Sequence, residues 1–400
     1  MVTTQAAGRT ISALLALLFV LGTQQAYGQG IAVTGVGAVN RSMGGACTAA
    51  PLESLGALNW NPGSISGLID NEVSFGAELL LANITLSSSI GGTSGSTDGE
   101  SGVAVIPAVG WVHHLEESPI SIGFGMYGIG GFRNNMPADP SNPILASGPI
   151  FADAELMQIA PTISYQLTER LSVGAAPTIT LARMMFDPLG PSAITPTPTP
   201  GSGNREHWGG GFQVGAYYTG ENNWNFGCSF KSPQWFETFR FFTPSGVTKF
   251  NLDYPLTVSL GTSYTGFDRW VIAADVRYFD YGNAPGFRTL GWNSVFAGAI
   301  GAQYQASERW KLRMGYNFNE NPIGTNDVAL NIADPLIQTH NIATGCSYAF
   351  TPNVDINLAY VYLVNNKVTG PLPPPFAPTD TISNEIAAHS LALGITVRYR

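Results

Sequence analysis

The stretch Ser390-Leu-Ala-Leu-Gly-Ile-Thr-Val-Arg-Tyr399 alternates strictly between apolar residues and small or polar ones. Successive side chains of a β-strand point to opposite faces, so this alternation predicts a strand with one apolar face. The segment Trp310-Lys-Leu-Arg-Met-Gly-Tyr-Asn-Phe318 repeats the pattern. From Asn71 onward we find about fourteen such segments, and no helical period competes with them. The chain is therefore predicted to be all-β.

Soluble β-sandwiches show the same alternation, so the lengths of the connections decide the architecture. The connections after every second segment are short, at residues 115–118, 168–170, 220–223, 266–269, 306–309 and 350–353. The intervening ones are long, for example at residues 91–102, 133–153, 187–206 and 365–388. Transmembrane β-barrels combine tight periplasmic turns with long extracellular loops. We therefore predict an antiparallel transmembrane barrel of about 14 strands over residues 71–400.

Aromatic residues on the apolar face support this architecture. They flank the short turns, at Tyr165, Tyr218, Trp224, Tyr264, Trp270, Tyr304, Trp310 and Tyr348. Aromatic rings at one depth on the lipid-facing side form the girdle of a membrane interface. The core of a sandwich gives no reason for aromatic residues to gather at one end.

The composition excludes several classes of protein. Only 11% of the residues are charged, where about 25% is usual for a soluble domain. The net charge of -9 and the lack of a basic run argue against nucleic acid, because phosphate binding needs clustered Lys and Arg. The three cysteines fit neither a complete disulfide framework nor a zinc spacing. No linker or change of composition divides the chain, which favours one large domain.

The beginning of the chain has the pattern of a secretory signal peptide at residues 1–28. Arg9 precedes an apolar run at residues 11–21, and Ala26-Tyr-Gly28 places small residues where a signal peptidase reads them. The apolar run is about half the length that a membrane-spanning helix needs. We expect the signal peptide to be removed and the protein to be integral to the bacterial outer membrane.

Residues 29–70 do not alternate and are rich in Gly, Ala and Ser. They contain the turn elements Gly44-Gly45 and Asn61-Pro62-Gly63, and Arg41 is their only basic residue. A barrel of this size has a lumen too wide for wall side chains alone to fill. We predict that residues 29–70 form an N-terminal plug in the lumen, the alternative being a loose periplasmic tail.

Several motifs resemble one known family. They are Gly35-Val-Gly-Ala-Val-Asn-Arg-Ser-Met-Gly-Gly-Ala46, Asn59-Trp-Asn-Pro62, Glu72-Val-Ser-Phe-Gly76, Ala160-Pro-Thr162 with Tyr165, Leu171-Ser-Val-Gly174, Tyr254-Pro-Leu256, and Leu312-Arg-Met-Gly-Tyr316 followed by Pro322. In this order they resemble the FadL family of outer-membrane transporters for long-chain fatty acids and toluene-type hydrocarbons. The resemblance extends along the chain from Gly35 onward. The chain departs from the family pattern at two places. Gly63 stands where the usual motif Asn-Pro-Ala has alanine, and the last residue is Arg400, after Tyr399, where outer-membrane barrels commonly end in an aromatic residue.

The resemblance implies a fourteen-stranded barrel with an N-terminal hatch and a hydrophobic pocket above it. It also implies a kinked third strand that opens the wall sideways into the membrane. The third segment loses its alternation at Tyr127-Gly128-Ile129-Gly130-Gly131, and glycines inside a strand mark a bulge or bend. This segment is the candidate lateral opening, and an ordinary bulge at the rim is the alternative.

Charged residues of the predicted lumen face gather near the periplasmic rim. They are Lys311, Arg313, Arg398 and Asp355, with Asp70 and Glu72 where the plug joins the barrel. These residues either latch the plug to the wall or receive a substrate carboxylate on its way out. Ordinary solvated lumen charges are the third interpretation.

Candidate pocket residues in the upper lumen are Phe279, Tyr217 and the flexible stretch Met184-Met185-Phe186, because Met suits apolar ligands of varied shape. Trp235 and Phe236, with Phe239, Phe241 and Phe242, put many aromatic rings in one loop, either as an outer capture site or as mutual packing. The five histidines offer no catalytic arrangement: His113 and His114, as neighbours on a strand, point to opposite faces. We predict no catalytic residue, metal or cofactor.

The sequence therefore predicts an outer-membrane transporter for the passive uptake of hydrophobic small molecules, either fatty acids or aromatic hydrocarbons. A general porin is the main alternative and predicts an open, charged lumen. A structural or adhesive barrel is another. The expected partners are the hydrophobic substrate, outer-membrane lipid and lipopolysaccharide, and the barrel-assembly machinery.

Overall fold

The structure is a computed structural model that describes residues 29–189, 205–243 and 246–399. The predicted signal peptide and part of the loop at residues 187–206 lie outside these ranges. Within them, no helix combines the length and the apolar character needed to cross a membrane.

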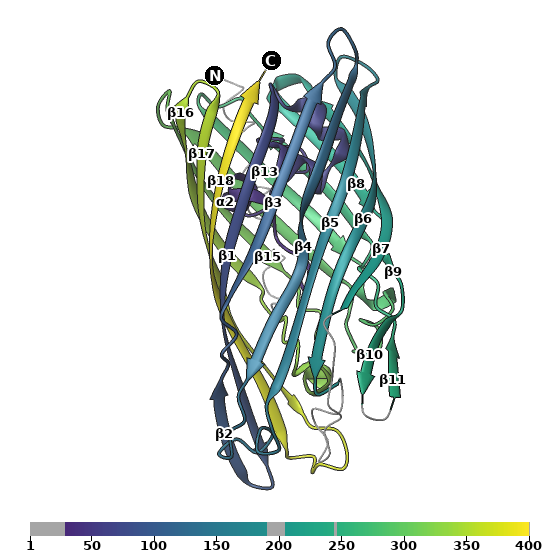
Figure 1. Ribbon diagram of the computed structural model, residues 1–400. Helices are drawn as coiled ribbons and strands as arrows, with labels where there is room; N and C mark the ends of the chain where they lie inside the picture. Colours follow the sequence, from purple (N-terminus) through teal and green to yellow (C-terminus); the bar gives the residue numbers. More distant parts are fainter. Residues whose placement is uncertain (1–28, 190–204, 244–245, 400) are drawn as a thin grey trace.

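Fourteen strands of the described chain form a closed antiparallel barrel (Figure 1), as predicted. Each strand pairs with its neighbours in the chain, and β1 closes the ring by pairing with β18 from Asn71↔Tyr399 to Ser89↔Thr381. The wall strands are β1 (Asn71–Ile90), β3 (Val103–His114), β4 (Ile120–Met136), β5 (Ile150–Gln166), β6 (Leu171–Asp187), β7 (Arg205–Thr219), β8 (Trp224–Lys231), β12 (Thr257–Tyr264), β13 (Trp270–Phe279), β14 (Val295–Gln305), β15 (Trp310–Asn319), β16 (His340–Thr351), β17 (Val354–Pro371) and β18 (Thr381–Tyr399).

The alternation has the predicted orientation. On β18, Leu393 and Ile395 are 50% and 47% exposed on the outer face, whereas Ser390 and Ala392 are buried toward the lumen. Closure leaves no unpaired strand edge, which is the condition for placing a β-sheet in hydrocarbon. The wall is therefore apolar outside and mixed inside.

Smaller elements occupy the connections. Strand β2 (Thr93–Asp98) pairs with the end of β1, and β9 (Trp235–Phe236) pairs with β7. Strands β10 (Phe239–Thr243) and β11 (Gly246–Phe250) form a separate hairpin. Short 3-10 helices lie in three connections, at η4 (Glu221–Asn223), η5 (Tyr281–Asn283) and η6 (Thr325–Asn331).

The boundaries predicted for three long loops are wrong, because the strands extend farther. Strands β17 and β18 pair as far as Pro371↔Thr381, so the loop predicted at residues 365–388 shrinks to residues 372–380. Strands β4 and β5 pair as far as Met136↔Ile150, and β2 lies inside the connection at residues 91–102. These strand ends contain runs of polar residues with no apolar residue at every second position. The alternation used to predict strands could therefore not identify them.

The aromatic girdle is confirmed at the rim with the short turns. Tyr165, Tyr218, Trp270 and Trp310 are between 39% and 46% exposed on the outer face. Rings of adjacent strands also contact each other, with centroid distances of 4.9 Å for Trp224 and Tyr264, 4.7 Å for Trp270 and Tyr304, and 4.9 Å for Trp310 and Tyr348. This rim lies at the end of the barrel that carries the C-terminus (Figure 1).

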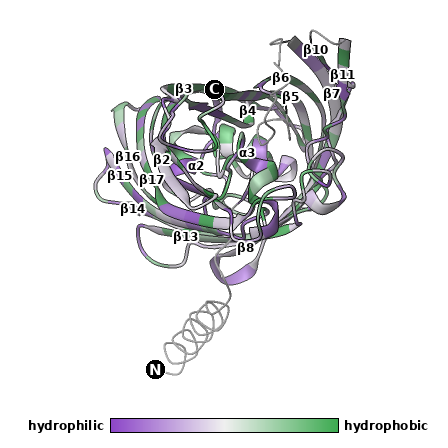
Figure 2. Cartoon of the chain, turned by 90° about the horizontal axis from the view of Figure 1, so that it is seen from below, coloured by the Kyte–Doolittle hydropathy of each residue, from purple (hydrophilic) through white to green (hydrophobic). Residues whose placement is uncertain are grey.

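The N-terminal segment lies inside the barrel (Figure 2). It contains α2 (Gly37–Ser42), α3 (Ser54–Trp60) and η2 (Pro62–Gly67), most of whose residues are buried. Helix α2 contacts β15 to β18 and β1, α3 contacts β1, β3 and β4, and η2 contacts β4 to β8. We call residues 29–70 the plug.

Glycines in the wall allow the plug backbone to approach closely. A Cβ atom on Gly315 would overlap the backbone of Met43 and Gly44, and one on Gly215 would overlap the side chain of Asn61. Close approaches of this kind include those at Gly174, Gly215, Gly227, Gly301, Gly315 and Gly345, which lie on six different strands. We call these six residues the glycine belt. Their lack of side chains fixes the depth at which the plug sits.

We predict that Gly315→Val loosens the plug, because its side chain would displace backbone that cannot move aside as a side chain can. The steady ionic conductance of single barrels in planar bilayers should rise several-fold. The matched control is Gly298→Val, because a Cβ atom at Gly298 meets nothing within 4 Å and β-branched residues suit strands. An unchanged conductance in correctly folded Gly315→Val would contradict the role of the belt.

Candidate functional site

An ion cluster fastens the plug to β13. Asp275 Oδ2 accepts hydrogen bonds from the backbone N–H groups of Cys47 (2.8 Å) and Thr48 (3.0 Å) and from Thr48 Oγ1 (2.9 Å). Arg277 donates to the same oxygen and to Gly45 O, both at 2.6 Å. Its guanidinium carbon lies 3.5 Å from the centroid of the Trp60 ring. These buried charges pair with each other and hold both halves of the plug to one strand.

A second buried ion pair joins the plug to β1. Arg41 donates to Glu78 Oε1 at 2.6 Å and also to Thr34 Oγ1. Ser390 on β18 donates to the same carboxylate oxygen at 2.5 Å. A buried charge is stable only when it is paired and hydrogen-bonded, and Arg41 meets this condition here.

The other predicted plug residues are buried in the same region. Asn61 donates to Thr48 O (2.8 Å) and to Ala216 O on β7 (2.9 Å), and its oxygen accepts from the N–H of Gly63 (3.0 Å). Pro62 opens η2. Gly44 and Gly45 have φ values of +66° and +88°, which favour glycine, and they end the turn after α2.

The charged residues predicted near the periplasmic rim are brought together in part. Asp355 forms ion pairs with Arg398 and with Lys311 (3.4 Å), and Arg398 also lies 3.7 Å from Asp70. Glu72 contacts the plug directly, because its carboxylate accepts the Ser54 N–H at 2.5 Å. Arg313 donates instead to Gln303 and Ser347 on the neighbouring wall strands, both at 2.7 Å.

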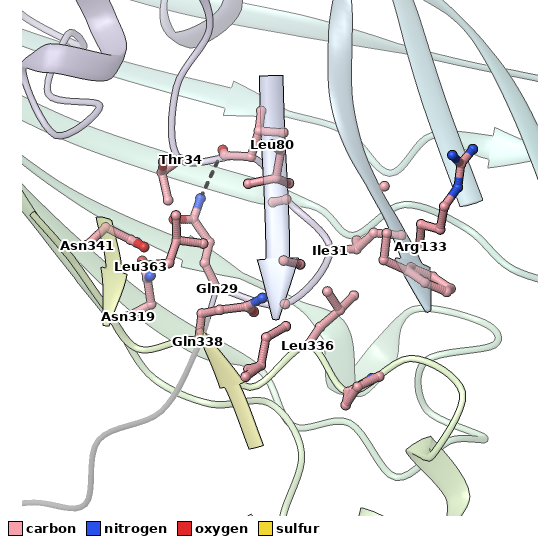
Figure 3. Close-up of a pocket in the computed structure, with 18 of the residues that line it drawn as sticks. Gln29, Ile31, Thr34, Leu80, Arg133, Asn319, Leu336, Gln338, Asn341 and Leu363 are labelled. Atoms are coloured by element: carbon pink, nitrogen blue, oxygen red, sulfur yellow. Dashed lines mark hydrogen bonds between the residues drawn. The ribbon is translucent and has the colours of Figure 1, made fainter. Parts of the chain in front are cut away.

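On the side of the plug that faces the long extracellular loops, which is the lower side in Figure 1, lies a cavity of about 110 Å³ (Figure 3). We call it the upper cavity, taking the extracellular side as up. Its apolar lining comes from several strands and from a loop, with Leu80, Ile84, Phe132, Leu336, Leu363 and Ile386 among the residues. Residues 29–34, the N-terminal strap, run along it, and the side chain of Gln29 donates to Val33 O at 3.3 Å. Arg41 and Glu78 form part of its floor.

The lumen face of β1 changes character at the level of the plug. Glu72, Ser74 and Glu78 lie beside the plug, and the next lumen-facing residues are Leu80, Ala82, Ile84 and Leu86. The polar half meets the backbone and charges of the plug, whereas the apolar half lines the upper cavity. This division is what a pocket for an apolar molecule above a polar seal requires.

None of the predicted pocket residues lines the upper cavity. The position predicted for Tyr217 is wrong: it pairs with Ser172 near a periplasmic turn, and its ring lies against Gly67 of the plug. Phe279 packs on Tyr281 with ring centroids 6.2 Å apart. Met184 is buried, and Phe186 contacts Phe132 of the cavity wall at 6.1 Å. Met185 follows on the opposite face of β6.

The predicted capture residues divide between surface and packing. Trp235 is 52% exposed, and Phe236 packs against Phe239 with ring centroids 5.7 Å apart. Phe239 and Phe241 are buried. Within the described ranges, no group of three or more His, Cys, Asp or Glu side chains gathers as metal ligands would.

The predicted kink of the third wall strand is a β-bulge. The pairing of β4 with β5 shifts between Gly128 and Gly130, so Ile129 is the extra residue. On its other side, β4 pairs with β3 only as far as Ala108↔Tyr127. The next backbone bond that we find along this edge in the described chain runs from Glu100 N to Asn135 O (2.7 Å). The wall ladder is therefore interrupted between these two points.

The N-terminal strap lies against this interruption. Val33 N donates to Ile129 O (3.1 Å), and Gly131 N donates to Ile31 O (3.3 Å). Tyr281 holds the strap from the other side through a bond from its hydroxyl to Gln29 O (2.8 Å). The strap therefore pairs with the bulged strand in the manner of a short extra strand.

A small cavity of about 10 Å³ lies in the wall at this place. It is lined by lumen residues such as Val33 and Glu78 and by the lipid-facing residues Pro107 and Leu393, with Gly128 beside them. We call this small cavity the wall window. Its volume is close to that of one water molecule, so it is constricted in this structure.

The family model for outer membrane protein transport proteins (OMPP1/FadL/TodX) matches residues 17–400 of the chain. The chain belongs to this family. The predicted resemblance is thereby confirmed, and the protein is an outer-membrane β-barrel transporter of hydrophobic compounds. Among curated protein sequences, none matches the chain.

Solved structures show the same fold at low sequence identity. The toluene transporter TodX of P. putida is 17% identical, with a TM-score of 0.70 over 92% of this chain and 99% of that one. A FadL homologue of Pseudomonas aeruginosa is 14% identical, with a TM-score of 0.71 over 93% and 100%. The Ralstonia pickettii toluene transporter TbuX is 15% identical, with a TM-score of 0.65 over 92% and 99%.

Sequence reasoning missed the residues that fasten the plug most directly. Asp275 and Arg277 share the lumen face of β13, and a close pair of opposite charges within an otherwise apolar strand was the available signal. Glu53 and Glu78 carried no comparable signal. Their surroundings depend on contacts between the plug and distant strands.

Glu53 is a buried acid of the plug that gives a test of plug stability. Burial raises its pKa to about 8, and the nearby carboxylate of Glu72 adds to the rise. The folded plug therefore binds a proton that the unfolded segment releases, so its stability falls as pH rises from about 4.5 to 8.

We predict that Glu53→Gln removes this pH dependence, because an amide stays neutral and its oxygen can still accept the Asn40 N–H. Hydrogen exchange of α3 amides should be several-fold slower than in the unaltered protein at pH 9, after correction for intrinsic rates, and similar at pH 5. Equal protection of the two proteins at pH 9 would refute the prediction.

Proposed function

We propose that the protein takes up small hydrophobic molecules passively, through the upper cavity and then sideways through the wall window. The observation that carries this proposal is an apolar cavity with a fastened polar floor, next to an interruption of the β3–β4 ladder. A molecule in the cavity has a polar barrier below it and lipid beyond the adjacent wall. Diffusion along this route needs no catalytic group.

The alternatives are less well supported. A general porin needs an open aqueous lumen, whereas the plug here contacts strands around the barrel. A structural or adhesive barrel would leave both the apolar cavity and the glycine belt without a purpose.

The cavity favours a small and uncharged cargo. Its volume of about 110 Å³ is comparable to that of a dry cavity of about 150 Å³ that holds benzene. Both cations in its lining already contact carboxylates, Arg41 with Glu78 and Arg133 with Asp153. Two solved structures of similar fold bear the name of toluene transporters. We therefore favour a single-ring or similarly small neutral hydrocarbon over a long-chain carboxylate.

Charge selectivity can be tested with Glu78→Gln. The change leaves Arg41 without its buried counter-ion, so a carboxylate in the cavity gains a partner. We predict that the uptake of an aromatic acid rises about tenfold relative to that of the matching neutral hydrocarbon. Labelled substrates and proteoliposomes would give the ratio.

The control for this experiment is Glu221→Gln, which breaks an exposed ion pair with Arg170 in a periplasmic turn. It should leave the ratio unchanged. If Glu78→Gln leaves the ratio unchanged as well, Arg41 and Glu78 do not set the charge of the cargo.

The lateral route can be tested with Gly128→Leu. A Cβ atom at Gly128 would already lie 2.6 Å from a methyl carbon of Ile106, so the longer side chain should fill the wall window. We predict a loss of most hydrocarbon uptake, with a conductance as low as that of the unaltered protein. Gly298→Leu is the control, and heat-modifiable electrophoretic mobility verifies folding. Normal uptake through folded Gly128→Leu would exclude this exit.

A further inference from the structure

The β10–β11 hairpin projects from the side of the barrel. In Figure 2 it lies outside the ring of wall strands, beyond β7. Its inner face is anchored by Phe239 and Phe241, which are 0% and 4% exposed. Phe239 contacts His207 at 4.4 Å between ring centroids, and Phe241 contacts Phe186 at 6.0 Å. The hairpin is therefore a fixed part of the surface.

The outer face of the hairpin combines two cations with two apolar residues. Arg240 pairs across the strands with Lys249, and Phe242 pairs with Val247. All four are exposed, Phe242 to 40% and Val247 to 49%. Because alternate residues of a strand share a face, these two cross-strand pairs lie side by side. We call these four residues the hairpin patch.

The charges of the patch lack a counter-ion in the described protein. Like charges directly opposite each other destabilise a strand pair, yet neither Arg240 nor Lys249 forms an ion pair within the described residues. The nearest acids along the chain are already engaged: Glu237 accepts the Trp208 N–H and Asp253 accepts the Phe236 N–H, both at 3.0 Å. In a chain with 27 acidic and 18 basic residues, residues 239–250 contain two basic residues and no acidic one.

The depth of the hairpin points to the ligand. Trp208 lies ten residues along β7 from Tyr218 of the periplasmic girdle, which corresponds to a height of about 25 Å for a tilted strand. This height equals that of the apolar band of an outer-membrane barrel. Trp208 and Trp235 are 55% and 52% exposed, as expected at the outer interface. The hairpin follows directly beyond them, at the depth of the lipid head groups.

We propose that the hairpin patch binds lipopolysaccharide of the outer leaflet. Arg240 and Lys249 contact a phosphate of its lipid A head group, where guanidinium and ammonium donors form charge-assisted hydrogen bonds. Phe242 and Val247 contact the apolar part of the same molecule. The bound phosphate removes the repulsion between the two cations. This site is separate from the transport route and does not depend on the proposed function.

The test measures binding of bisphosphorylated lipid A to the full, folded chain in detergent by native mass spectrometry. The double variant Arg240→Glu/Lys249→Glu should bind about tenfold more weakly than the unaltered protein. The matched control is Arg269→Glu/Arg309→Glu, which reverses two exposed charges in periplasmic turns and should stay within about twofold. Heat-modifiable mobility verifies folding, and Arg240→Gln/Lys249→Gln replaces the charge reversal if that variant fails to fold.

Three further ligands test whether the patch recognises phosphorylated lipid A or any phosphate-bearing molecule. Dephosphorylated lipid A should bind the unaltered protein as weakly as the double variant does, and phosphatidylglycerol or inorganic phosphate should compete poorly. The proposal is overturned if the variant and the unaltered protein bind lipid A equally. It is also overturned if dephosphorylated lipid A binds undiminished, or if phosphatidylglycerol binds as tightly.

Discussion

The hydrogen-bonded ladder between β1 and β18 is the constraint on which the rest of the structure depends. In hydrocarbon each unpaired backbone group costs several kcal/mol, so a sheet can cross the membrane only as a closed ring. The 19 residue pairs from Asn71↔Tyr399 to Ser89↔Thr381 complete that ring. Closure dictates the apolar outer face, the aromatic rim and the alternation of short and long connections. It also creates a lumen that must be filled, and the glycine belt shows how closely the wall accommodates the filling.

The lumen is divided into two halves by charge. Where the plug meets the wall, Asp275 pairs with Arg277, and both bond to the plug backbone. Arg41 of the plug pairs with Glu78 of the wall. Beyond Glu78, toward the extracellular end of β1, the lumen-facing side chains of Leu80, Ala82 and Ile84 are aliphatic. Buried charges need partners, and the wall residues Glu78, Asp275 and Arg277 find theirs partly in the plug, so each of them fixes a part of it. The same division places Arg41 and Glu78 in the floor of the upper cavity and aliphatic residues of β1 in its wall, beside polar residues such as Asn319 and Asn341.

Local patterns predicted the barrel well because its determinants are local. Alternation, loop lengths and aromatic positions are all read within a few residues, and the bulge at Gly128 and Gly130 was visible as a break in alternation. The site was predicted less well, because it depends on contacts between distant residues. Cys47 and Asp275 are separated by 228 positions, and the register of β6 and β7 alone places Tyr217 beside the plug. Polar strand ends such as those of β17 and β18 escaped detection because water removes the need for alternation there.

The relative strengths of these contacts are a physical argument for the lateral exit that we propose, as opposed to displacement of the plug. Displacing the plug would break the buried ion pair between Arg41 and Glu78, and breaking one such pair costs about 3–5 kcal/mol. It would also remove the hydrogen bonds that Asp275 and Arg277 form with the plug backbone. At the wall window, two backbone hydrogen bonds join the N-terminal strap to Ile129 and Gly131 of β4, and two more join it to the Tyr281 hydroxyl. Each contributes about 1 kcal/mol. The β3–β4 ladder is already interrupted at this point, so no wall hydrogen bond has to break. Movement of the strap is therefore the less costly change that could connect the upper cavity to the membrane.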